Sequence, residues 1–212
     1  MNKQINRIFS ALLERNPNPA CELEYINDYT FLVAIVLSAQ TTDKAVNKAT
    51  KPLFAKIKSP SDMLKLGNDG LKEYIKSIGL YNSKAEYIMR LSADLIAKHG
   101  GTVPKDFDEL VKLKGVGRKT AKVFLNSKYN QPLIAVDTHV YRVAGRLGIA
   151  VGKTVAAVET ELEKNVPLQY KTKASHLLVL HGRYICTAKK PKCHECVVAS
   201  YCPSAVGGND SD

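Results

Sequence analysis

Apolar residues recur three and four positions apart along most of the chain, which is the spacing of one face of an α-helix. The first run begins at Ile5 and is stopped by Asn16-Pro17. The pattern predicts helices over residues 5–13, 44–57, 82–98, 105–113, 118–128, 138–147, 153–165 and 171–185. Two short helices are expected to open at Ser61-Asp62 and Asn68-Asp69, and Gly79 is expected to end the second. Residues 30–39 are a dense apolar run in the same pattern.

Signals of other structure are few. Thr42-Asp43 offers a cap for the helix over 44–57, which Pro52 interrupts. Only residues 133–136 resemble a strand, and so short a run without a partner is better explained as a buried connector. The sequence therefore predicts an all-α fold. Residues 204–212 are small, polar and acidic, so this tail is expected to be disordered.

Composition narrows the class of protein. The 212 residues can bury a core as one domain or as two small ones, and 45% of them are hydrophobic. The net charge of +11 favours a polyanionic partner, most often nucleic acid, over a merely basic cytosolic protein. No run of 18 apolar residues is present, and the N-terminus has no signal-peptide pattern, so a cytoplasmic protein is expected.

Four of the five cysteines are clustered near the C-terminus in the spacing C-x6-C-x2-C-x5-C. In a reducing compartment such a cluster indicates metal ligands rather than disulfides. From spacing alone, a zinc ion and an iron–sulfur cluster are both open. The loop inside the cluster carries Lys190 and Lys192, which a bound metal would hold against DNA phosphates. The predicted ligands are Cys186, Cys193, Cys196 and Cys202.

A glycine hairpin, Gly115-Val116-Gly117, lies between two predicted helices. Two glycines one residue apart allow positive φ and a tight turn, which bares backbone N–H groups. The following helix, which opens with Arg118, adds its own unpaired N–H groups and its positive dipole end, so the hairpin is suited to bind a phosphate. An ordinary turn between two helices is the other interpretation.

Lys119 stands out beside this hairpin. A lysine on a helix is usually a solvated charge, but this one lies in the first turn, where the helix dipole disfavours an ammonium. Arg118 precedes it and Lys122 lies at i+3 on the same face. These effects favour the neutral amine, which a nucleophile requires. The connector 129–136 is long enough to bring Asp137 back beside the start of this helix, although Asp137 also fits a helix N-cap.

The sequence resembles the endonuclease III family of helix-hairpin-helix DNA glycosylases over nearly its whole length. The resemblance is specific because independent motifs occur in the family's order. They are residues 37–43, 79–85, 113–121, 134–139 and 181–184 and the cysteine cluster. One departure is visible: the family hairpin usually reads Leu-Pro-Gly, whereas this chain has Leu113-Lys114-Gly115.

The resemblance implies a bifunctional glycosylase and abasic-site lyase that removes oxidised pyrimidines from double-stranded DNA. Lys119 would be the nucleophile and Asp137 the catalytic carboxylate, and the four cysteines would hold one 4Fe–4S cluster. Gln40 and Leu80 match the positions that fill the gap left by the flipped base. Their ordinary interpretations are a polar residue near a loop and a half-buried leucine.

The resemblance also implies two helical domains. A six-helix domain with the helix-hairpin-helix motif would span residues 22–132. The iron–sulfur domain would combine residues 1–21 with 133–203, and the active site would lie in the cleft between the domains. A monomer without membrane contact is expected.

Two rival functions remain. One is a sister glycosylase that removes mismatched adenine, a family with the same cysteines but without the lysine and with a further C-terminal domain. The other is a non-catalytic DNA-binding module stapled by zinc. Lys119, its pairing with Asp137 and the short stretch after Cys202 favour the bifunctional enzyme.

Overall fold

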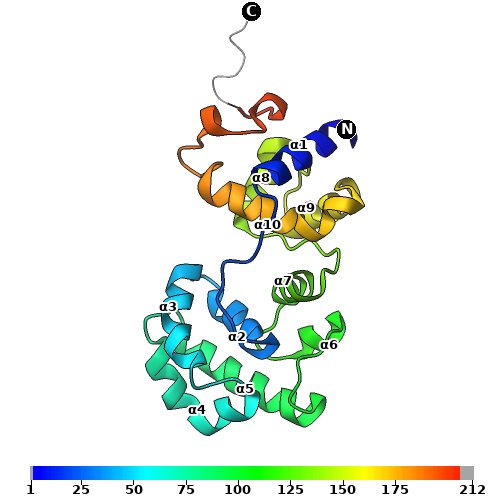
Figure 1. Cartoon of the computed structure of the whole chain (residues 1–212). Helices are drawn as coiled ribbons and strands as arrows, with labels where there is room; N and C mark the ends of the chain where they lie inside the picture. The colour runs from blue at the N-terminus through cyan, green and yellow to red at the C-terminus, as the bar shows by residue number, and fades with distance from the viewer. Residues whose placement is uncertain (1, 206–212) are drawn as a thin grey trace, which may run out of the picture. The chain divides into compact units, whose positions relative to one another are not determined.

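The computed structural model describes residues 2–205, and these residues form ten α-helices, two short 3₁₀ helices and no strand (Figure 1). The predicted all-α fold is confirmed. The predicted disordered tail reaches into residues 206–212, which lie outside the described residues. The α-helices are α1 (Asn2–Arg15), α2 (Asp28–Ser38), α3 (Asp43–Phe54), α4 (Pro60–Ile75), α5 (Tyr81–His99), α6 (Phe107–Lys112), α7 (Arg118–Tyr129), α8 (Thr138–Leu147), α9 (Val155–Asn165) and α10 (Leu168–Tyr184).

Capping residues define most helix ends. Thr42 caps α3 by accepting a hydrogen bond from the Ala45 N–H group, as predicted. The prediction for α4 was wrong at both ends. The helix begins at Pro60, where Ser59 and Asp62 form a capping box, and it ends at Ile75 rather than at Gly79. The two predicted short helices are joined in α4 across a kink at Gly67, whose φ of 76° no helical residue adopts.

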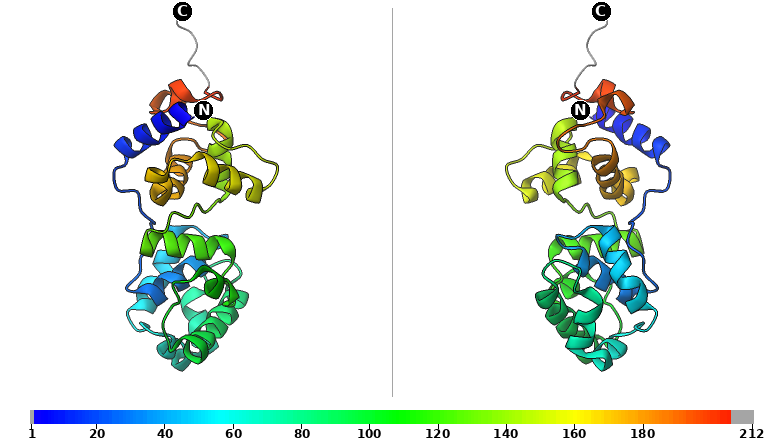
Figure 2. Two further views of the ribbon diagram at one scale, coloured as in Figure 1. Left: turned by 90° about the vertical axis from the view of Figure 1, so that its right-hand side faces the viewer. Right: turned by 90° about the vertical axis from the view of Figure 1, so that its left-hand side faces the viewer.

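Contacts divide the chain into two compact units. One unit is Glu22–Tyr129, and the other combines Met1–Cys21 with Asn130–Asp212. In the second unit α1, from the start of the chain, packs on α10, from near its end (Figure 2). The unit is therefore closed by residues from both ends of the sequence.

Helix α2 is the centre of the unit Glu22–Tyr129. All residues from Tyr29 to Leu37 are buried, and α3, α5 and α7 pack around the helix. A helix that is apolar on every side is stable only inside such a ring of neighbours. This explains the dense apolar run at residues 30–39.

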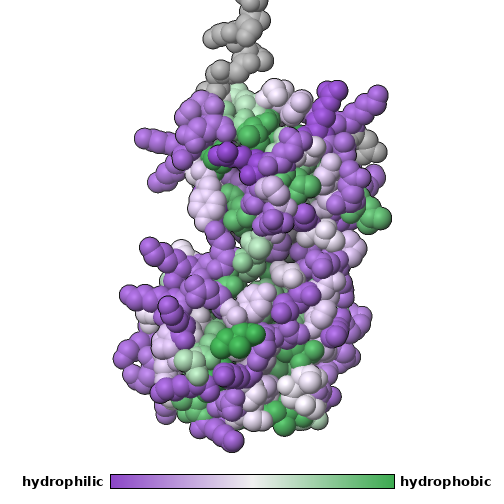
Figure 3. Space-filling view, in the orientation of Figure 1, coloured by the Kyte–Doolittle hydropathy of each residue, from purple (hydrophilic) through white to green (hydrophobic). Residues whose placement is uncertain are grey.

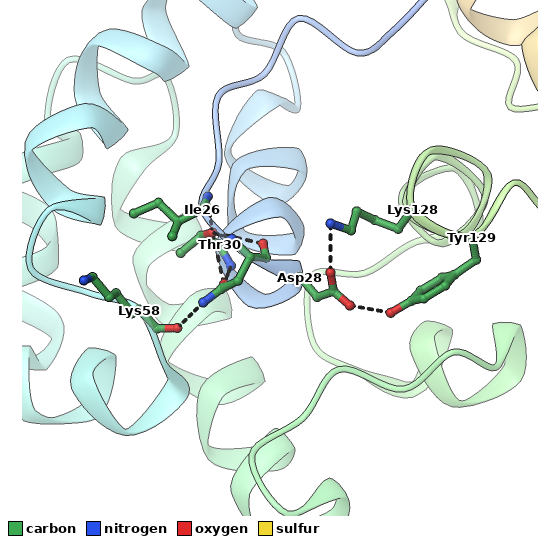
Figure 4. Close-up of polar contacts among 7 residues, drawn as sticks. Ile26, Asp28, Thr30, Lys58, Lys128 and Tyr129 are labelled. Atoms are coloured by element: carbon green, nitrogen blue, oxygen red, sulfur yellow. Dashed lines mark hydrogen bonds and ion pairs between the residues drawn. The ribbon is translucent and has the colours of Figure 1, made fainter.

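Polar contacts secure the start of α2 (Figure 4). Asn27 caps the helix, and its side-chain amide donates to the Lys58 carbonyl at 2.7 Å. Asp28 forms an ion pair with Lys128, with Nζ and Oδ1 3.0 Å apart, and accepts a hydrogen bond from the Tyr129 hydroxyl. The first turn of α2 is thereby tied to the last turn of α7.

In the other unit, α8 packs against α10. The close approach depends on Gly182, because a Cβ atom there would lie 2.9 Å from Val143 Cγ2 and 3.1 Å from His139 Cβ. The connector before α8 is buried at Ile134, Ala135 and Val136. It is not a strand, in agreement with its interpretation as a buried connector.

The face of the molecule drawn in Figure 3 is mostly hydrophilic. On the face shown in Figure 3, purple side chains cover most of the area, and green hydrophobic side chains form separate patches. Among residues 2–205 no helix is both long enough and apolar enough to cross a membrane.

Candidate functional site

The helix-hairpin-helix consists of α6, residues 113–117 and α7. Leu113 and Val116 are buried, and the Val116 N–H group donates to the Leu113 carbonyl at 3.1 Å, which closes the turn. Gly115 is required here for two reasons. Its φ is +81°, and a Cβ atom at this position would lie 2.8 Å from Tyr87 Cβ on α5. The hairpin is therefore packed firmly onto α5.

The second hairpin glycine behaves differently from the prediction. Gly117 does not have a positive φ, and a Cβ atom there would meet no protein atom within 4 Å. The turn itself therefore does not require a glycine at this position. The open space leaves room for a ligand to approach the backbone at the start of α7.

Basic side chains of the hairpin lie on aromatic rings. The Lys114 ammonium is 5.3 Å from the centre of the Tyr87 ring, and the Arg118 guanidinium is 5.1 Å from the centre of the Phe107 ring. Lys114, which replaces the family's proline, thus adds a contact with the same tyrosine that packs against Gly115. This contact helps to hold the turn in place of the proline ring.

Lys119 is an exposed residue in the first turn of α7, a turn without an acidic residue. The N–H groups of a helix's first turn have no partner within the helix and attract anions. Lys122, three positions after Lys119 in α7, is buried, with 4% of its surface exposed. The two lysines therefore do not form one exposed basic pair.

Asp137 is the N-cap of α8. Its Oδ1 atom accepts a hydrogen bond from the Val140 N–H group at 2.8 Å, and its carbonyl accepts from Tyr141 N–H. The cap fixes the position of the carboxylate at the start of α8. Lys119 and Asp137 belong to different units, and their predicted proximity stays a prediction.

Gln40 and Leu80 share an unusual backbone conformation. Their φ angles are +56° and +59°, and among residues 2–205 only one other residue that is not glycine, Asn130, has a positive φ. Leu80 is 64% exposed, so its ordinary interpretation as a half-buried leucine was wrong. Gln40 is exposed in the loop between α2 and α3.

The four clustered cysteines line one pocket in the unit that contains α8 and α10. Burial, followed by the charges of the other three thiols, raises the pKa of the Cys196 thiol. Burial, with charges of neighbouring thiols, also raises the pKa of Cys202. Four thiolates packed this way repel one another, and a bound cationic centre removes that repulsion.

Two arginines of α8 hold the start of the cysteine loop. Arg142 donates from Nε to the Cys186 carbonyl at 3.1 Å and from Nη2 to the Gly182 carbonyl at 2.7 Å. Arg146 donates from Nη1 to Cys186 Sγ at 3.4 Å and to the Thr187 carbonyl at 2.8 Å. Sequence reasoning missed both residues. The signal was their spacing of four on the polar side of an amphipathic helix.

Four cysteine side chains line the pocket, a donor set that suits either a zinc ion or an iron–sulfur cluster. A zinc ion with four thiolates would bring its sulfur atoms to roughly 3.8 Å from each other, as Zn–S bonds of about 2.3 Å require. An iron–sulfur core is larger and holds the same four sulfurs further apart.

Lys190 and Lys192 are exposed in the loop between Cys186 and Cys193. The loop is internally bonded, since the Thr187 hydroxyl donates to the Lys190 carbonyl at 2.6 Å. Lys192 Nζ lies 3.9 Å from Glu195 Oε2, and both side chains are half exposed. Such a pair is weak, so its lysine remains able to meet a phosphate.

Two family profiles match the chain. That of the HhH-GPD superfamily base excision DNA repair protein covers residues 33–168, and that of the iron–sulfur binding domain of endonuclease III covers residues 186–202. The chain is 54% identical to endonuclease III of Rickettsia conorii, over 93% of this chain and 94% of the relative. It is 49% identical to endonuclease III of Escherichia coli strain K12, over 92% of each.

Solved structures give the same result. The chain superposes with a TM-score of 0.91 and 42% identity on an endonuclease III trapped as a covalent intermediate with DNA, over 97% of each chain. A thermostable thymine-DNA glycosylase matches with a TM-score of 0.83 and 26% identity, over 96% of this chain and 97% of that one.

Proposed function

Because the chain belongs to the endonuclease III family, we propose that it removes oxidised pyrimidines from duplex DNA and then cuts the strand 3′ to the abasic site by β-elimination. It is a DNA-binding base excision repair enzyme, a DNA glycosylase and abasic-site lyase, and it carries an iron–sulfur centre. Beyond this general activity, the identity of the damaged base, the roles of individual residues and the order of bond breaking are proposed.

One observation carries the proposal. An exposed lysine, Lys119, lies in the first turn of the helix that follows a glycine hairpin suited to bind a phosphate, in a chain that matches endonuclease III along nearly its entire length. Gly115 fixes the turn, and Gly117 leaves its outer side open. A phosphate held at the start of α7 would place a nucleotide sugar close to the lysine amine.

The first step is base release. The damaged nucleotide is flipped out of the duplex, and the Lys119 amine attacks C1′ of its sugar. A C–N bond to lysine forms while the glycosidic bond breaks, and the base leaves with the bonding electrons and takes up a proton. Asp137 stabilises the cationic character of the sugar in this step and assists proton transfer.

The second step is strand cleavage. The sugar ring opens to a Schiff base with Lys119, and the iminium acidifies the proton on C2′. Loss of that proton forms a C2′–C3′ double bond and breaks the C3′–O bond, which expels the 3′ phosphate. Water then hydrolyses the Schiff base and returns the lysine amine. Gln40 and Leu80 occupy the space that the flipped base leaves in the duplex.

The metal centre is proposed to be one 4Fe–4S cluster held by Cys186, Cys193, Cys196 and Cys202. Its support is the pocket that the four cysteines line and the matching profile of the iron–sulfur binding domain of endonuclease III. A cluster bound to these four cysteines would hold the loop with Lys190 and Lys192 rigid. These lysines contact the DNA backbone, together with Arg118 at the hairpin.

Borohydride trapping on duplex DNA with an abasic site tests the proposal. Reduction of the Schiff base should join wild-type protein covalently to DNA, and Lys119→Gln should give no adduct while it still binds the duplex. A Lys119→Gln variant that cuts abasic DNA at the wild-type rate, without added amines, would refute the assigned nucleophile. A non-catalytic DNA-binding module would give no adduct even as wild type.

The damaged base is tested separately. Single-turnover base release should be fast on duplexes with oxidised pyrimidines and slow on an adenine mismatch. The reverse order would support the sister glycosylase. We also propose that the protein is a monomer and is located in the cytoplasm. Sedimentation with and without DNA tests whether it is a monomer.

A further inference from the structure

A buried lysine links the two loops that carry Gln40 and Leu80. Lys84, in the first turn of α5, donates its three ammonium hydrogens to the Leu37 carbonyl at 2.9 Å, the Ala39 carbonyl at 2.7 Å and Thr41 Oγ1 at 3.0 Å. These acceptors lie at the end of α2 and on both sides of Gln40. The Lys84 backbone N–H group donates to the Leu80 carbonyl at 3.0 Å.

The hydrogen bonds occupy every donor of the Lys84 ammonium group. An ammonium has three donors, and all three are bonded. Only 4% of the residue is exposed, and burial lowers the pKa of Lys84. The acceptors are neutral, and no described hydrogen bond or ion pair joins this lysine to a carboxylate. A buried cation without a counter-ion is costly, so packing alone does not explain its presence.

Part of the cost is offset by α2. The last carbonyls of a helix have no partner within it and carry the negative end of its dipole. Lys84 supplies that partner at Leu37 and then reaches beyond the helix to Ala39 and Thr41. The contact therefore determines where the chain leaves α2 and enters the loop.

Gln40 and Leu80, which lie next to the hydrogen bonds of Lys84, both have a strained backbone. Gln40 and Leu80 have the left-handed conformation, which residues with a Cβ atom adopt only when their surroundings impose it. Strain of this kind is concentrated where a side chain must be held ready for a task. Lys84 donates hydrogen bonds to Ala39 and Thr41, which flank Gln40, and to the carbonyl of Leu80.

We propose that Lys84 is a positioning residue that holds Gln40 and Leu80 in one preformed arrangement for insertion into the DNA duplex. The inference rests on the proposed function, in which these two residues replace the flipped base. Lys84 touches neither the nucleotide nor Lys119 in this proposal. It acts by fixing two loops before DNA is bound, so that no ordering of the loops remains to be done during flipping.

The same two helices offer a matched control. The Tyr29 hydroxyl, near the start of α2, is hydrogen-bonded to Ser92 Oγ in α5 at 2.6 Å, and both residues are buried. Ser92 Oγ also donates to the Ile88 carbonyl, so Tyr29→Phe removes the bond without leaving the serine unpaired. This change weakens α2–α5 packing far along α2 from the Gln40 loop.

The test compares Lys84→Met, Lys84→Arg and Tyr29→Phe in single-turnover base release from a duplex with one oxidised pyrimidine. If the preformed arrangement falls to about one-tenth of molecules, Lys84→Met slows release about tenfold. Lys84→Arg should recover part of the rate, and Tyr29→Phe should not change it. A Lys84→Met variant that retains the wild-type rate would overturn the proposal.

A double-mutant cycle separates positioning from stability. In a Gln40→Ala and Leu80→Ala background, Lys84→Met should cause less than about a twofold further loss, because no inserted pair remains to be positioned. An equal loss in both backgrounds would show that Lys84 supports the unit as a whole and would refute positioning. If Lys84→Met fails to fold, Thr41→Val removes one acceptor and should give a smaller loss with the same dependence on background.

Trapping identifies which proposal has failed. Wild-type protein that forms no borohydride adduct with abasic DNA contradicts the proposed function itself. Wild-type and Lys84→Met proteins that both form the adduct, with equal base release, contradict only the role of Lys84.

Discussion

Replacing Asp28 by asparagine should destabilise the unit Glu22–Tyr129 in a pH-dependent way. The carboxylate pairs with Lys128, accepts the Tyr129 hydroxyl and lies in the first turn of α2, where the helix dipole favours a negative charge. Asparagine keeps an oxygen that can accept from Tyr129, but it loses the charge. The change therefore isolates the electrostatic part of the contact.

The expected loss of stability depends on how far solvent screens the Asp28–Lys128 pair. The side chain of Asp28 is 38% exposed and that of Lys128 is 22% exposed, so the pair is partly screened by solvent. Hydrogen bonds to a charged group contribute about 1.5–3 kcal/mol when buried and less at the surface. A loss of about 1–2 kcal/mol is expected, which lowers Tm by roughly 2–8 °C for a protein of this size.

The pH dependence gives the sharper test. Burial raises the pKa of the Asp28 carboxyl, but hydrogen bonds from Tyr129 and Lys128 and the charges of Lys128 and Lys105 outweigh it and hold the pKa below its usual range. Stabilisation from a carboxyl with a lowered pKa is complete above the unfolded value, about 3.9, and disappears as the pH falls through the folded value. The Tm difference between wild type and Asp28→Asn should therefore be full at pH 7 and shrink below about pH 4.

Thermal unfolding followed by circular dichroism at several pH values measures this difference. Asp69→Asn is the control, because the side chain of Asp69 is 98% exposed and its pairing with Lys72 should contribute little at any pH. A Tm difference of the same size at pH 7 and pH 3 would refute the electrostatic reasoning, since it would show that asparagine disturbs packing instead.

Three further predictions concern the site. Gly115→Ala should lower the free energy of unfolding by about 2 kcal/mol, because residue 115 has a positive φ and its Cβ atom would collide with Tyr87. Gly117→Ala should change the free energy of unfolding by no more than about 0.5 kcal/mol but weaken duplex binding. Urea unfolding and binding titrations measure these effects, and equal stability of the two variants would contradict the hairpin geometry. Lys190→Ala with Lys192→Ala should reduce the slope of log affinity against log salt by up to roughly 1.8, or about 0.9 per lost phosphate contact, equally for damaged and undamaged duplexes; an unchanged slope would show that the loop does not face DNA. Isolated protein should be yellow-brown with broad absorbance near roughly 400 nm, and colourless active protein with one zinc per chain would contradict the iron–sulfur assignment.

Local signals predicted most of the fold. The helix over 138–147 has the predicted bounds, and Thr42 caps α3 as expected, because caps depend on neighbouring residues alone. The start of α4 was misplaced although its capping box, Ser59 with Asp62, is also local. The kink at Gly67 lies directly before Asn68-Asp69, where a second helix was predicted to open.

The site was predictable where a motif fixes the chemistry and not where distant parts of the chain meet. The cysteines share one pocket as their spacing suggests. The roles of Lys84 and Arg146 depend on partners 40 or more residues away in the sequence, which no pattern in a single chain reveals. For the same reason Gly115 and Gly117 could not be told apart before the position of Tyr87 was known.

The uniformly apolar surface of α2 has a consequence for how uniquely the chain folds. An amphipathic helix is held in one rotational setting because turning it would expose its stripe to water, but a helix buried on all sides loses little by rotating or sliding among its neighbours. Hydrophobic burial alone thus leaves several registers close in energy. Asp28 at the start of α2, and Lys84 of α5 at its end, make their contacts in only one of these registers, so polar contacts at the two ends of the helix select a single native packing from a degenerate set.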